Sequence, residues 1–278
     1  MSKPIDEYKI VSCPAASIYS SPSFKSEIIN QALIWEKLII CDKKNNWYKI
    51  KQRDGYIGWI HSFYTVDASI YDKNHLLKDH TNWYWVKDKF ITLLLDDNSK
   101  FLISFGSLIP CFNNKDYFFT LLPNNEKVRI NKESLIKFTD SLNCLENLAH
   151  CSKQLLGTPY LWGGRSSFGF DCSGLVQSLF NVCYTNASNY SLDILPRDTS
   201  QQILSGNLKE ITNGPNIGDI IFFQTSNKVD HVGLYINTID FIHSSGFVKR
   251  NSINKQSQYY SNKLDVNLSG IYRIKISC

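Results

Sequence analysis

Cys172 lies at the start of an expected helix, where the chemistry of a thiol can be altered. It follows the glycine-rich segment Gly157–Arg165 and precedes an apolar stripe at helical spacing, formed by Leu175, Val176, Leu179, Phe180 and Cys183. Unpaired N–H groups and the positive end of the helix dipole favour a thiolate at that position. Asp171 is a suitable N-cap. Taken alone, Cys172 fits a nucleophile and a small buried residue at a helix start equally well.

Two histidines make the catalytic interpretation of Cys172 stronger. His231 and His243 are twelve residues apart on two expected strands. A hairpin whose loop is centred on Asn237 would place the two residues directly opposite, with Cβ atoms roughly 5 Å apart. A lone histidine on a strand is usually structural, but a thiol peptidase needs a nucleophile, a base and a group that fixes the tautomer of the base. The sequence therefore predicts Cys172 as nucleophile, His231 as base and His243 as the third group.

The elements around these residues divide the chain into domains. Short strands with polar turns run from 14 to 67 and predict a small barrel of five or six strands, and a second such series runs from 81 to 138. The two series are candidates for diverged repeats. Helices and then strands follow, which is typical of an α+β domain. The expected domains are an N-terminal extension (1–13), a barrel (14–70), a second, diverged barrel (81–140) and the α+β domain (143–278).

The composition excludes several classes of protein. The chain has 278 residues, is 43% hydrophobic and has a net charge of +5, spread without a basic run, so we expect no nucleic-acid partner. We see no export signal and no apolar run of membrane-spanning length, so we expect no membrane partner. The eight cysteines have irregular spacing without metal-ligand pairs, which predicts reduced thiols, a cytoplasmic location, and no metal. We expect a monomer.

Several motifs carry a resemblance to a known family. The segments Asp171–Val176, Asp230–Gly233 and Ile242-His243 resemble the three motifs of the NlpC-type (NlpC/P60) cysteine peptidases. The segments Pro159–Gly164 and Gly218–Ile220 are also similar to that family. The resemblance covers roughly residues 145 to 277. It implies a papain-like α+β core, no cofactor, and hydrolysis of peptide bonds in the stem peptides of bacterial cell walls.

The first barrel indicates which group of these peptidases the chain resembles. Residues 14–67 resemble the bacterial SH3-like barrel that precedes the catalytic domain in γ-D-glutamyl-L-diamino-acid endopeptidases, which require a free N-terminal L-Ala. The resemblance implies that Glu36 and Tyr56 close one end of the cleft. An ammonium group needs acceptors, which Glu36 and Asp171 could supply. In the alternative interpretation, Glu36 is a solvated carboxylate at a strand end and Tyr56 is part of the barrel core.

Four further residues are candidates for substrate binding. Arg197 could hold a substrate carboxylate with two hydrogen bonds, or it could form an ion pair that orders a loop. Asp198 lies beside Arg197 in a segment that resembles a family segment near the cleft. Ser173 lies in the family motif that contains Cys172. The hydroxyl of Tyr160, twelve residues before Cys172, could help to bind an oxyanion or the substrate, with buried packing as the alternative.

The function expected from these residues is that of a cytosolic cysteine endopeptidase. It would cut the bond between γ-D-Glu and the diamino acid in free L-Ala-γ-D-Glu-diamino acid peptides, through a Cys172 thioester, during recycling of cell-wall peptides. Three alternatives are a secreted hydrolase of intact peptidoglycan, a non-catalytic wall-binding protein, and a Cys–His amidase or acyltransferase acting on another small amide.

Overall fold

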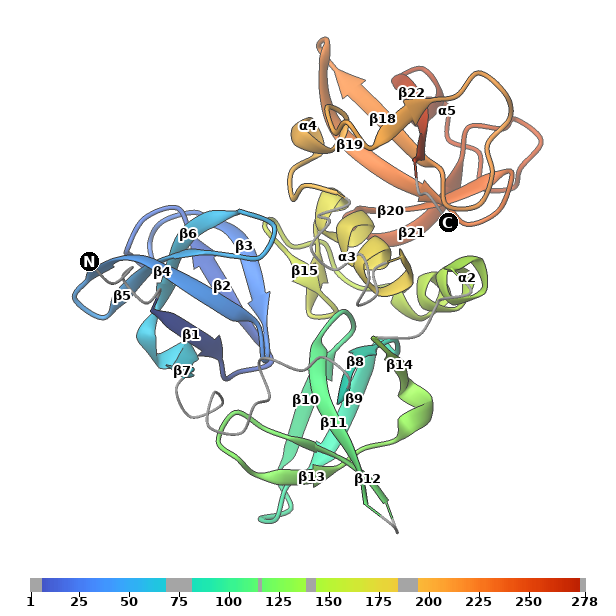
Figure 1. Ribbon diagram of the computed structural model, residues 1–278. Helices are drawn as coiled ribbons and strands as arrows, with labels where there is room; N and C mark the ends of the chain where they lie inside the picture. Colours follow the sequence, from blue (N-terminus) through green and yellow to red (C-terminus); the bar gives the residue numbers. More distant parts are fainter. Residues whose placement is uncertain (1–6, 69–81, 115–116, 139–143, 185–194, 276–278) are drawn as a thin grey trace. The chain divides into compact units, whose positions relative to one another are not determined.

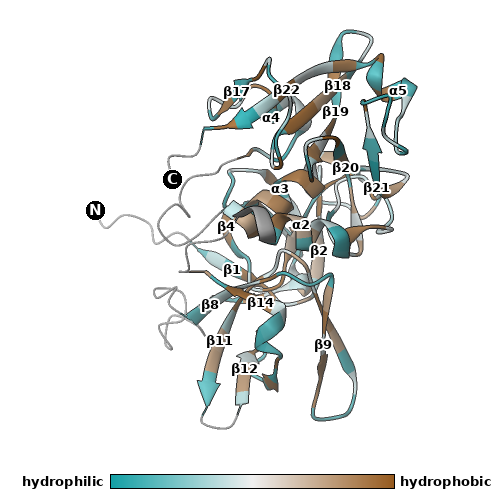
Figure 2. Ribbon diagram, turned by 90° about the vertical axis from the view of Figure 1, so that its right-hand side faces the viewer, coloured by the Kyte–Doolittle hydropathy of each residue, from teal (hydrophilic) through white to brown (hydrophobic). Residues whose placement is uncertain are grey.

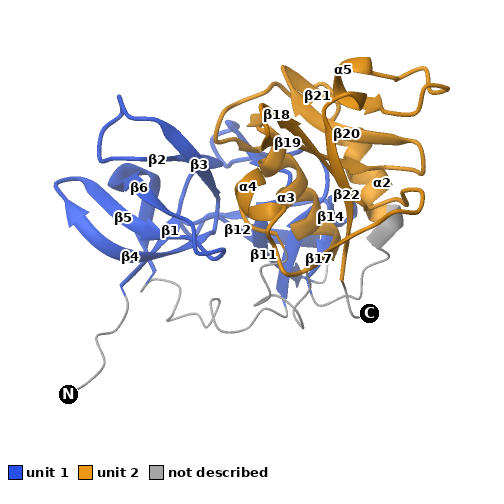
Figure 3. Cartoon of the chain, turned by 90° about the horizontal axis from the view of Figure 1, so that it is seen from above, with its two compact units in different colours: residues 1–141, 186–190 blue, residues 142–185, 191–278 orange. Residues whose placement is uncertain are grey.

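The computed structural model describes residues 7–68, 82–114, 117–138, 144–184 and 195–275. The chain forms two compact units, one of residues 1–141 with 186–190 and one of residues 142–185 with 191–278 (Figure 3). The domain limits predicted at 70, 81, 140 and 143 lie outside the described residues. The two units are described separately below.

The first barrel is one antiparallel sheet in the order β3-β2-β6-β5-β4-β1-β7. Its elements are β1 (Tyr8–Val11), β2 (Ala15–Tyr19), β3 (Ile28–Leu33), β4 (Lys37–Lys44), β5 (Trp47–Lys51), β6 (Ile57–His61), the 3-10 helix η1 (Ser62–Tyr64) and β7 (Thr65–Asp67). Its core contains Val11, Ala16, Ile18, Ala32, Leu38, Ile50 and Ile60. Strand β1 pairs with β4 and β7. The predicted N-terminal extension (1–13) is therefore wrong for residues 8–11, and the barrel has seven strands instead of five or six.

The second barrel lies in the same unit and has a similar strand order, but its strands are divided into a two-stranded and a five-stranded sheet (Figure 1). Its elements are β8 (Trp83–Val86), β9 (Phe90–Leu94), β10 (Lys100–Ser104), β11 (Leu108–Asn114), β12 (Tyr117–Leu121), β13 (Lys127–Arg129), η3 (Lys132–Ser134) and β14 (Leu135–Lys137). In both barrels the first strand pairs with the fourth and the last, as β1 does with β4 and β7 and β8 does with β11 and β14. This shared order supports an origin of the two barrels as diverged repeats.

Trp35 and Gly106 occupy equivalent turns of the two barrels. Both have positive φ, 69° for Trp35 and 79° for Gly106, and each donates its backbone N–H at 3.0 Å to the end of the first strand of its barrel. Glycine adopts this conformation freely, whereas for a bulky residue it is strained. The indole Nε1 of Trp35 donates to the carbonyl oxygen of Leu121 in the second barrel at 2.9 Å. Its ring also meets Trp83 edge-on at 6.0 Å.

The second unit combines helices with one antiparallel sheet, in the order β17-β22-β18-β19-β20-β21. Its elements are α2 (Cys144–Leu155), β15 (Arg165–Ser166), β16 (Gly169–Phe170), α3 (Cys172–Tyr184), α4 (Thr199–Gln202), β17 (Leu208–Glu210), β18 (Ile220–Thr225), β19 (Lys228–Tyr235), β20 (Asp240–Ser245), β21 (Phe247–Ser252), α5 (Asn262–Asp265) and β22 (Leu268–Ile274). Helix α3 packs against β19 and β20. Figure 2 shows apolar residues along α3 and β18. The predicted α+β architecture is confirmed.

The hairpin of β19 and β20 has a different register from the one expected. Leu234 pairs with Ile242 and Tyr235 with Phe241, so the turn is centred on Thr238 instead of Asn237. The prediction that His231 and His243 are directly opposed is therefore wrong by two positions. Within the described residues, no helix has the length and apolar character needed to cross a membrane.

Candidate active site

Cys172 is the first residue of α3, as the sequence predicts. The carboxylate of Asp171 accepts the backbone N–H of Gly174 at 2.7 Å, which confirms Asp171 as the capping residue. Gly174 is required because a Cβ at this position would lie 2.2 Å from the carbonyl oxygen of Gly164. The glycine-rich loop before the cysteine therefore packs directly against the first turn of the helix and holds the thiol in place.

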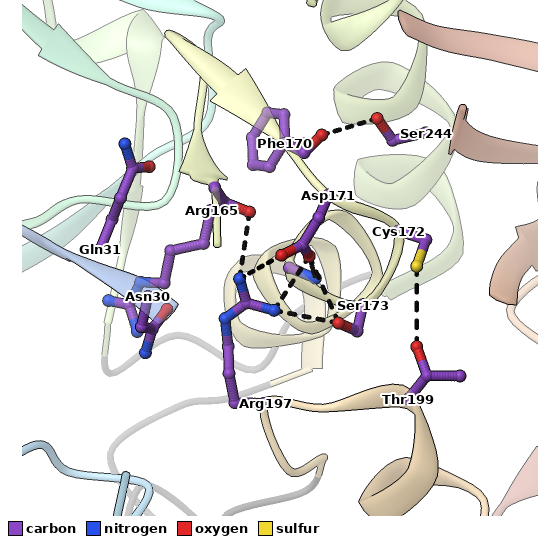
Figure 4. Close-up of polar contacts among 12 residues, drawn as sticks. Asn30, Gln31, Arg165, Phe170, Asp171, Cys172, Ser173, Arg197, Thr199 and Ser244 are labelled. Carbon is purple, nitrogen blue, oxygen red and sulfur yellow. Dashed lines mark hydrogen bonds and ion pairs between the residues drawn. The ribbon is translucent and has the colours of Figure 1, made fainter. Parts of the chain in front are cut away.

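The thiol of Cys172 is buried among hydrogen-bonding groups. Its Sγ lies 3.6 Å from the Thr199 hydroxyl (Figure 4). Burial raises the pKa of Cys172, the Asp171 carboxylate adds to that rise, and hydrogen bonds from Thr199 and from the backbone N–H groups of Ser173 and Val232 oppose it. The expectation that the helix start favours a thiolate is therefore outweighed by burial, and the resting group is a thiol. Because Val232 contacts the sulfur, β19 lies against Cys172.

The imidazoles of His231 and His243 form a hydrogen bond across β19 and β20. Nε2 of His231 lies 2.7 Å from Nδ1 of His243. Nε2 of His243 lies 2.8 Å from Oδ1 of Asn251 on β21. Burial lowers the pKa of His231 to about 3 and that of His243 to about 4, with positive charges such as Lys249 contributing. Both rings are neutral near pH 7, so a proton can be transferred from the thiol to an imidazole during reaction.

Arg197 is buried and bound to Asp171 in the second unit (Figure 4). Its side chain is 1% exposed, and its NH2 group is 2.6 Å from Oδ2 of Asp171. Its NH1 group also donates to the hydroxyl of Ser173 at 3.0 Å. These contacts favour the interpretation of Arg197 as an ion pair that orders a loop over that of a carboxylate-binding residue. Ser173 and Asp171 are likewise buried and hydrogen-bonded within this cluster.

Tyr160 lies close enough to Cys172 and Asp171 for their charges to affect its pKa. Burial raises the pKa of Tyr160 to about 12, and the charges of Cys172 and Asp171 add to that rise. Its backbone pairs with Phe170, directly before the catalytic segment. Asp198 is half-buried and is the N-cap residue of α4, whose first residue is Thr199. The roles of Tyr160 and Asp198 in substrate binding stay predictions.

Glu36 and Tyr56 belong to the first barrel. Glu36 directly precedes β4, is half-buried, and its Oε1 accepts a hydrogen bond of 2.8 Å from Nε2 of Gln52. Its Oε2 accepts the backbone N–H of Leu33 at 3.1 Å. Gln52 is in turn held by Asn30 at 2.7 Å. Glu36 is therefore a carboxylate with a fixed orientation instead of a freely solvated one. Tyr56 is half-buried beside the turn between β5 and β6.

Two residues of the site were not assigned a role from the sequence. Thr199 contacts the Cys172 sulfur, and Asn251 contacts His243. Thr199 directly follows Arg197 and Asp198, which the sequence already places near the cleft, so this proximity could have indicated a role for Thr199. Asn251 comes eight residues after His243, and only a prediction of β21 could have placed the two together. Among the described residues, no group of three or more His, Cys, Asp or Glu side chains could hold a metal ion.

Comparisons with known proteins agree with this arrangement. Residues 157–268 match the NlpC/P60 family and residues 14–65 match the bacterial SH3 domain. A gamma-D-glutamyl-L-lysine dipeptidyl-peptidase of Bacillus cereus is 27% identical over 241 residues, which are 79% of this chain and 68% of that protein. The probable endopeptidase NlpC of Escherichia coli is 34% identical over 112 residues, which are 39% of this chain and 67% of that protein.

A solved structure extends the likeness to the fold. The crystal structure of an NlpC/P60 family protein from Bacillus cereus matches with a TM-score of 0.78 at 20% identity, covering 96% of this chain and 99% of that one. At this identity the match shows the fold alone. The family match to the second unit, the SH3 match before it and the hydrogen-bonded pair of His231 and His243 agree: this chain belongs to the NlpC/P60 family of cysteine peptidases.

Proposed function

We propose that this protein is a cytosolic, monomeric cysteine endopeptidase that cuts the γ-D-glutamyl–diamino acid bond of free cell-wall stem peptides during their recycling. The observation that carries the proposal is the hydrogen bond of 2.7 Å between His231 and His243, on strands that pack against α3, the helix that begins with the buried Cys172. Nucleophile, base and orienting group are the parts that acyl transfer to a thiol requires.

The chemistry follows from the neutral resting state of these groups. The Cys172 sulfur attacks the carbonyl carbon of the D-Glu side chain as its proton passes to His231. His231 then gives that proton to the leaving amine as the C–N bond breaks, which leaves a thioester. Water attacks the thioester, its proton passes through His231 to the sulfur, and its hydroxyl stays on the acyl product. The backbone N–H of Cys172 and the hydroxyl of Tyr160 would stabilise the oxyanion, and one such donor is typically worth ~3 kcal/mol.

Relatives support the choice of substrate. The Bacillus cereus relative, which is similar over most of this chain, is named a gamma-D-glutamyl-L-lysine dipeptidyl-peptidase. Glu36 would accept the free ammonium group of L-Ala, since a carboxylate in a fixed orientation suits a short, charge-assisted hydrogen bond. Asp171 has less capacity for this role, because its Oδ1 already accepts from Gly174, Ser173 and Arg197. Its Oδ2 is the oxygen with room for another donor.

The role of Cys172 is tested by comparing it with a second cysteine on the same helix. Cys172→Ala should abolish hydrolysis of L-Ala-γ-D-Glu-diamino acid and leave the circular dichroism spectrum unchanged. Cys183→Ala is the matched control, because Cys183 is also buried on α3 but lies away from the helix start. It should keep most of its activity. Turnover near the wild-type rate in Cys172→Ala would exclude the thioester mechanism.

The substrate class is tested by offering three substrates to the purified protein. The free tripeptide should be cleaved, whereas the same peptide with an acetylated amine and whole sacculi should not. Equal cleavage of the acetylated peptide would remove the proposed role of Glu36. Cleavage of sacculi would favour a hydrolase of intact peptidoglycan, and cleavage of other amides alone would favour an amidase.

A further inference from the structure

His231, His243 and Asn251 form a diagonal line across three neighbouring strands. His243 pairs with Lys249 on β21, so Asn251 is displaced from it by two positions. On β19, the pairing of Leu234 with Ile242 places His231 two positions away from the point directly opposite His243. This displacement continues the same diagonal across the sheet. Diagonal neighbours in an antiparallel sheet are within reach of long or aromatic side chains. The two hydrogen bonds, of 2.7 and 2.8 Å, follow this line.

The orientation of the Asn251 amide is fixed from its other end. Its Nδ2 donates to the carbonyl oxygen of Tyr259 at 3.1 Å, so its Oδ1 must face Nε2 of His243. A carbonyl oxygen can only accept a hydrogen bond. Nε2 of His243 therefore carries the proton when the ring is neutral, and its Nδ1 carries a lone pair.

The same reasoning applies to the imidazole of His231. The lone pair on Nδ1 of His243 accepts a hydrogen bond, so Nε2 of His231 is the donor at 2.7 Å. In a neutral imidazole only one nitrogen carries a proton. Nδ1 of His231 is thereby left with the lone pair that a base requires. The carbonyl of Tyr259 is thus the start of a chain of hydrogen bonds that ends at the proton acceptor.

We propose that Asn251 is a positioning residue that sets the tautomers of both imidazoles, so that Nδ1 of His231 accepts the proton of Cys172. This proposal rests on the cysteine-peptidase function proposed above. In this role Asn251 acts through His243, which its side chain contacts directly. The second histidine cannot set the tautomer of the first by itself, because its own two nitrogens can exchange roles. A group that can only accept removes that freedom.

Asn251→Leu tests the proposal because leucine is similar in size and cannot accept a hydrogen bond. The expected result is a fall in kcat of about 10- to 100-fold with little change in KM, since loss of a group that orients a functional histidine typically has an effect of this size. In ¹H–¹⁵N correlation spectra of the imidazoles, His243 should be a single tautomer with its proton on Nε2 in the wild type and a mixture in the variant. Asn254→Leu is the control, because Asn254 follows the same strand, is exposed, and its side chain accepts the backbone N–H of Gln256 at 2.9 Å.

Asn251→Asp supplies a second measurement if the leucine variant does not fold. A carboxylate accepts the same N–H, so the tautomer of His243 should be kept. Its charge should raise the acidic limb of the pH profile of kcat/KM by about one unit or more. Lys249 on β21 and Lys263 on α5 act on the His231–His243 pair in the opposite direction, and both remain in every variant.

The outcomes separate this proposal from the proposed function. An unchanged tautomer of His243 with wild-type kcat in Asn251→Leu, or an unmoved pH profile in Asn251→Asp, would overturn the role of Asn251 and leave the peptidase function standing. If the wild-type protein hydrolysed no peptide, the function would fail. The imidazole spectra would still decide whether Asn251 sets the tautomers.

Discussion

Arg197 and Asp171 form a buried ion pair through two parallel hydrogen bonds, of 2.9 and 2.6 Å, directly beside the first turn of α3. The pair joins the residue before the nucleophile to the segment that supplies Thr199. One interpretation of the sequence is that Arg197 binds a substrate carboxylate, but its guanidinium donates to Asp171, Ser173 and the Gly164 carbonyl oxygen. Its contribution is therefore to hold the capping residue of the helix.

Removing the arginine should destabilise the catalytic unit strongly. Arg197→Met leaves the Asp171 carboxylate buried without its counter-ion, and loss of one partner of a buried pair typically costs about 3–5 kcal/mol. Urea denaturation of the full chain measures this change. Adding Asp171→Asn to the variant should restore part of the loss, because the unpaired charge is then removed.

The control for Arg197→Met is the loss of a solvent-exposed ion pair. Lys43 and Glu7 are 2.7 Å apart with side chains about half exposed, so Lys43→Met should leave the stability essentially unchanged. Equal effects of Arg197→Met and Lys43→Met would show that burial of the Arg197–Asp171 pair contributes nothing to stability.

Gly174→Ala should be destabilising although it adds a better helix former. In an exposed helix interior, alanine is favoured over glycine by about 1 kcal/mol. Here the added Cβ would lie 2.2 Å from the Gly164 carbonyl oxygen, so the loop or the helix start must shift. We expect a lower melting temperature and reduced kcat, because the same shift moves Cys172. Gly206→Ala is the comparison, since its Cβ would meet nothing within 4 Å. A more stable Gly174→Ala would contradict the described loop packing.

The free energy of unfolding should fall as the pH is lowered from about 6.5. The folded pKa values of His231 and His243, about 3 and about 4, lie below their ordinary value of 6.5. At pH values between 6.5 and these folded pKa values, the unfolded chain binds protons that the folded chain does not. Each ring therefore lowers the free energy of unfolding by about 1.4 kcal/mol for each unit by which the pH falls. Above pH 6.5 both states are neutral at these rings and this contribution is constant.

Urea denaturation at several values between pH 7 and pH 5 measures this slope. His243→Gln removes one of the two titrating rings and should make the slope shallower in that range. A free energy of unfolding that is flat over this range in the wild type would show that the two rings are not kept neutral by burial.

Gln52→Met should weaken the binding of free-amine peptides. Gln52 is buried and donates to Oε1 of Glu36 at 2.8 Å, so its loss frees the carboxylate from its fixed orientation. If Glu36 binds the ammonium of L-Ala, KM for the free tripeptide should rise about tenfold with little change in kcat, which is the effect of one hydrogen bond to a charged group. Steady-state kinetics separate the two constants. A change in kcat alone would place Gln52 in a general structural role.

The elements that carry the candidate catalytic groups could be predicted from the sequence because helix starts and strand alternation are local patterns. Cys172 opens α3, and His231 and His243 lie on neighbouring strands. The register between those strands could not be predicted. The side chain of Asn237 accepts the N–H groups of both Ile239 and Asp240 at 2.7 Å, which lengthens the turn and moves its centre to Thr238.

Contacts between distant segments were the other information that the sequence did not provide. Residues 8–11 have the composition of a strand, but their place in the first barrel depends on pairing with β4 and β7, which lie far along the sequence. The burial of Arg197 depends on Asp171, 26 positions earlier, and on the Gly164 carbonyl. Such residues look the same in a sequence whether they face solvent or an internal partner, so only the fold decides between the two roles.

The tryptophan at the left-handed turn of the first barrel has a consequence for the second. Trp35 holds a strained backbone immediately before Glu36, and its indole is anchored by Leu121 and Trp83 of the second barrel. Strain of this kind persists only where surrounding contacts enforce it. The second barrel therefore stabilises the left-handed turn at the residue that precedes the carboxylate. A protein without the second barrel would hold the Glu36 side chain in a less fixed orientation.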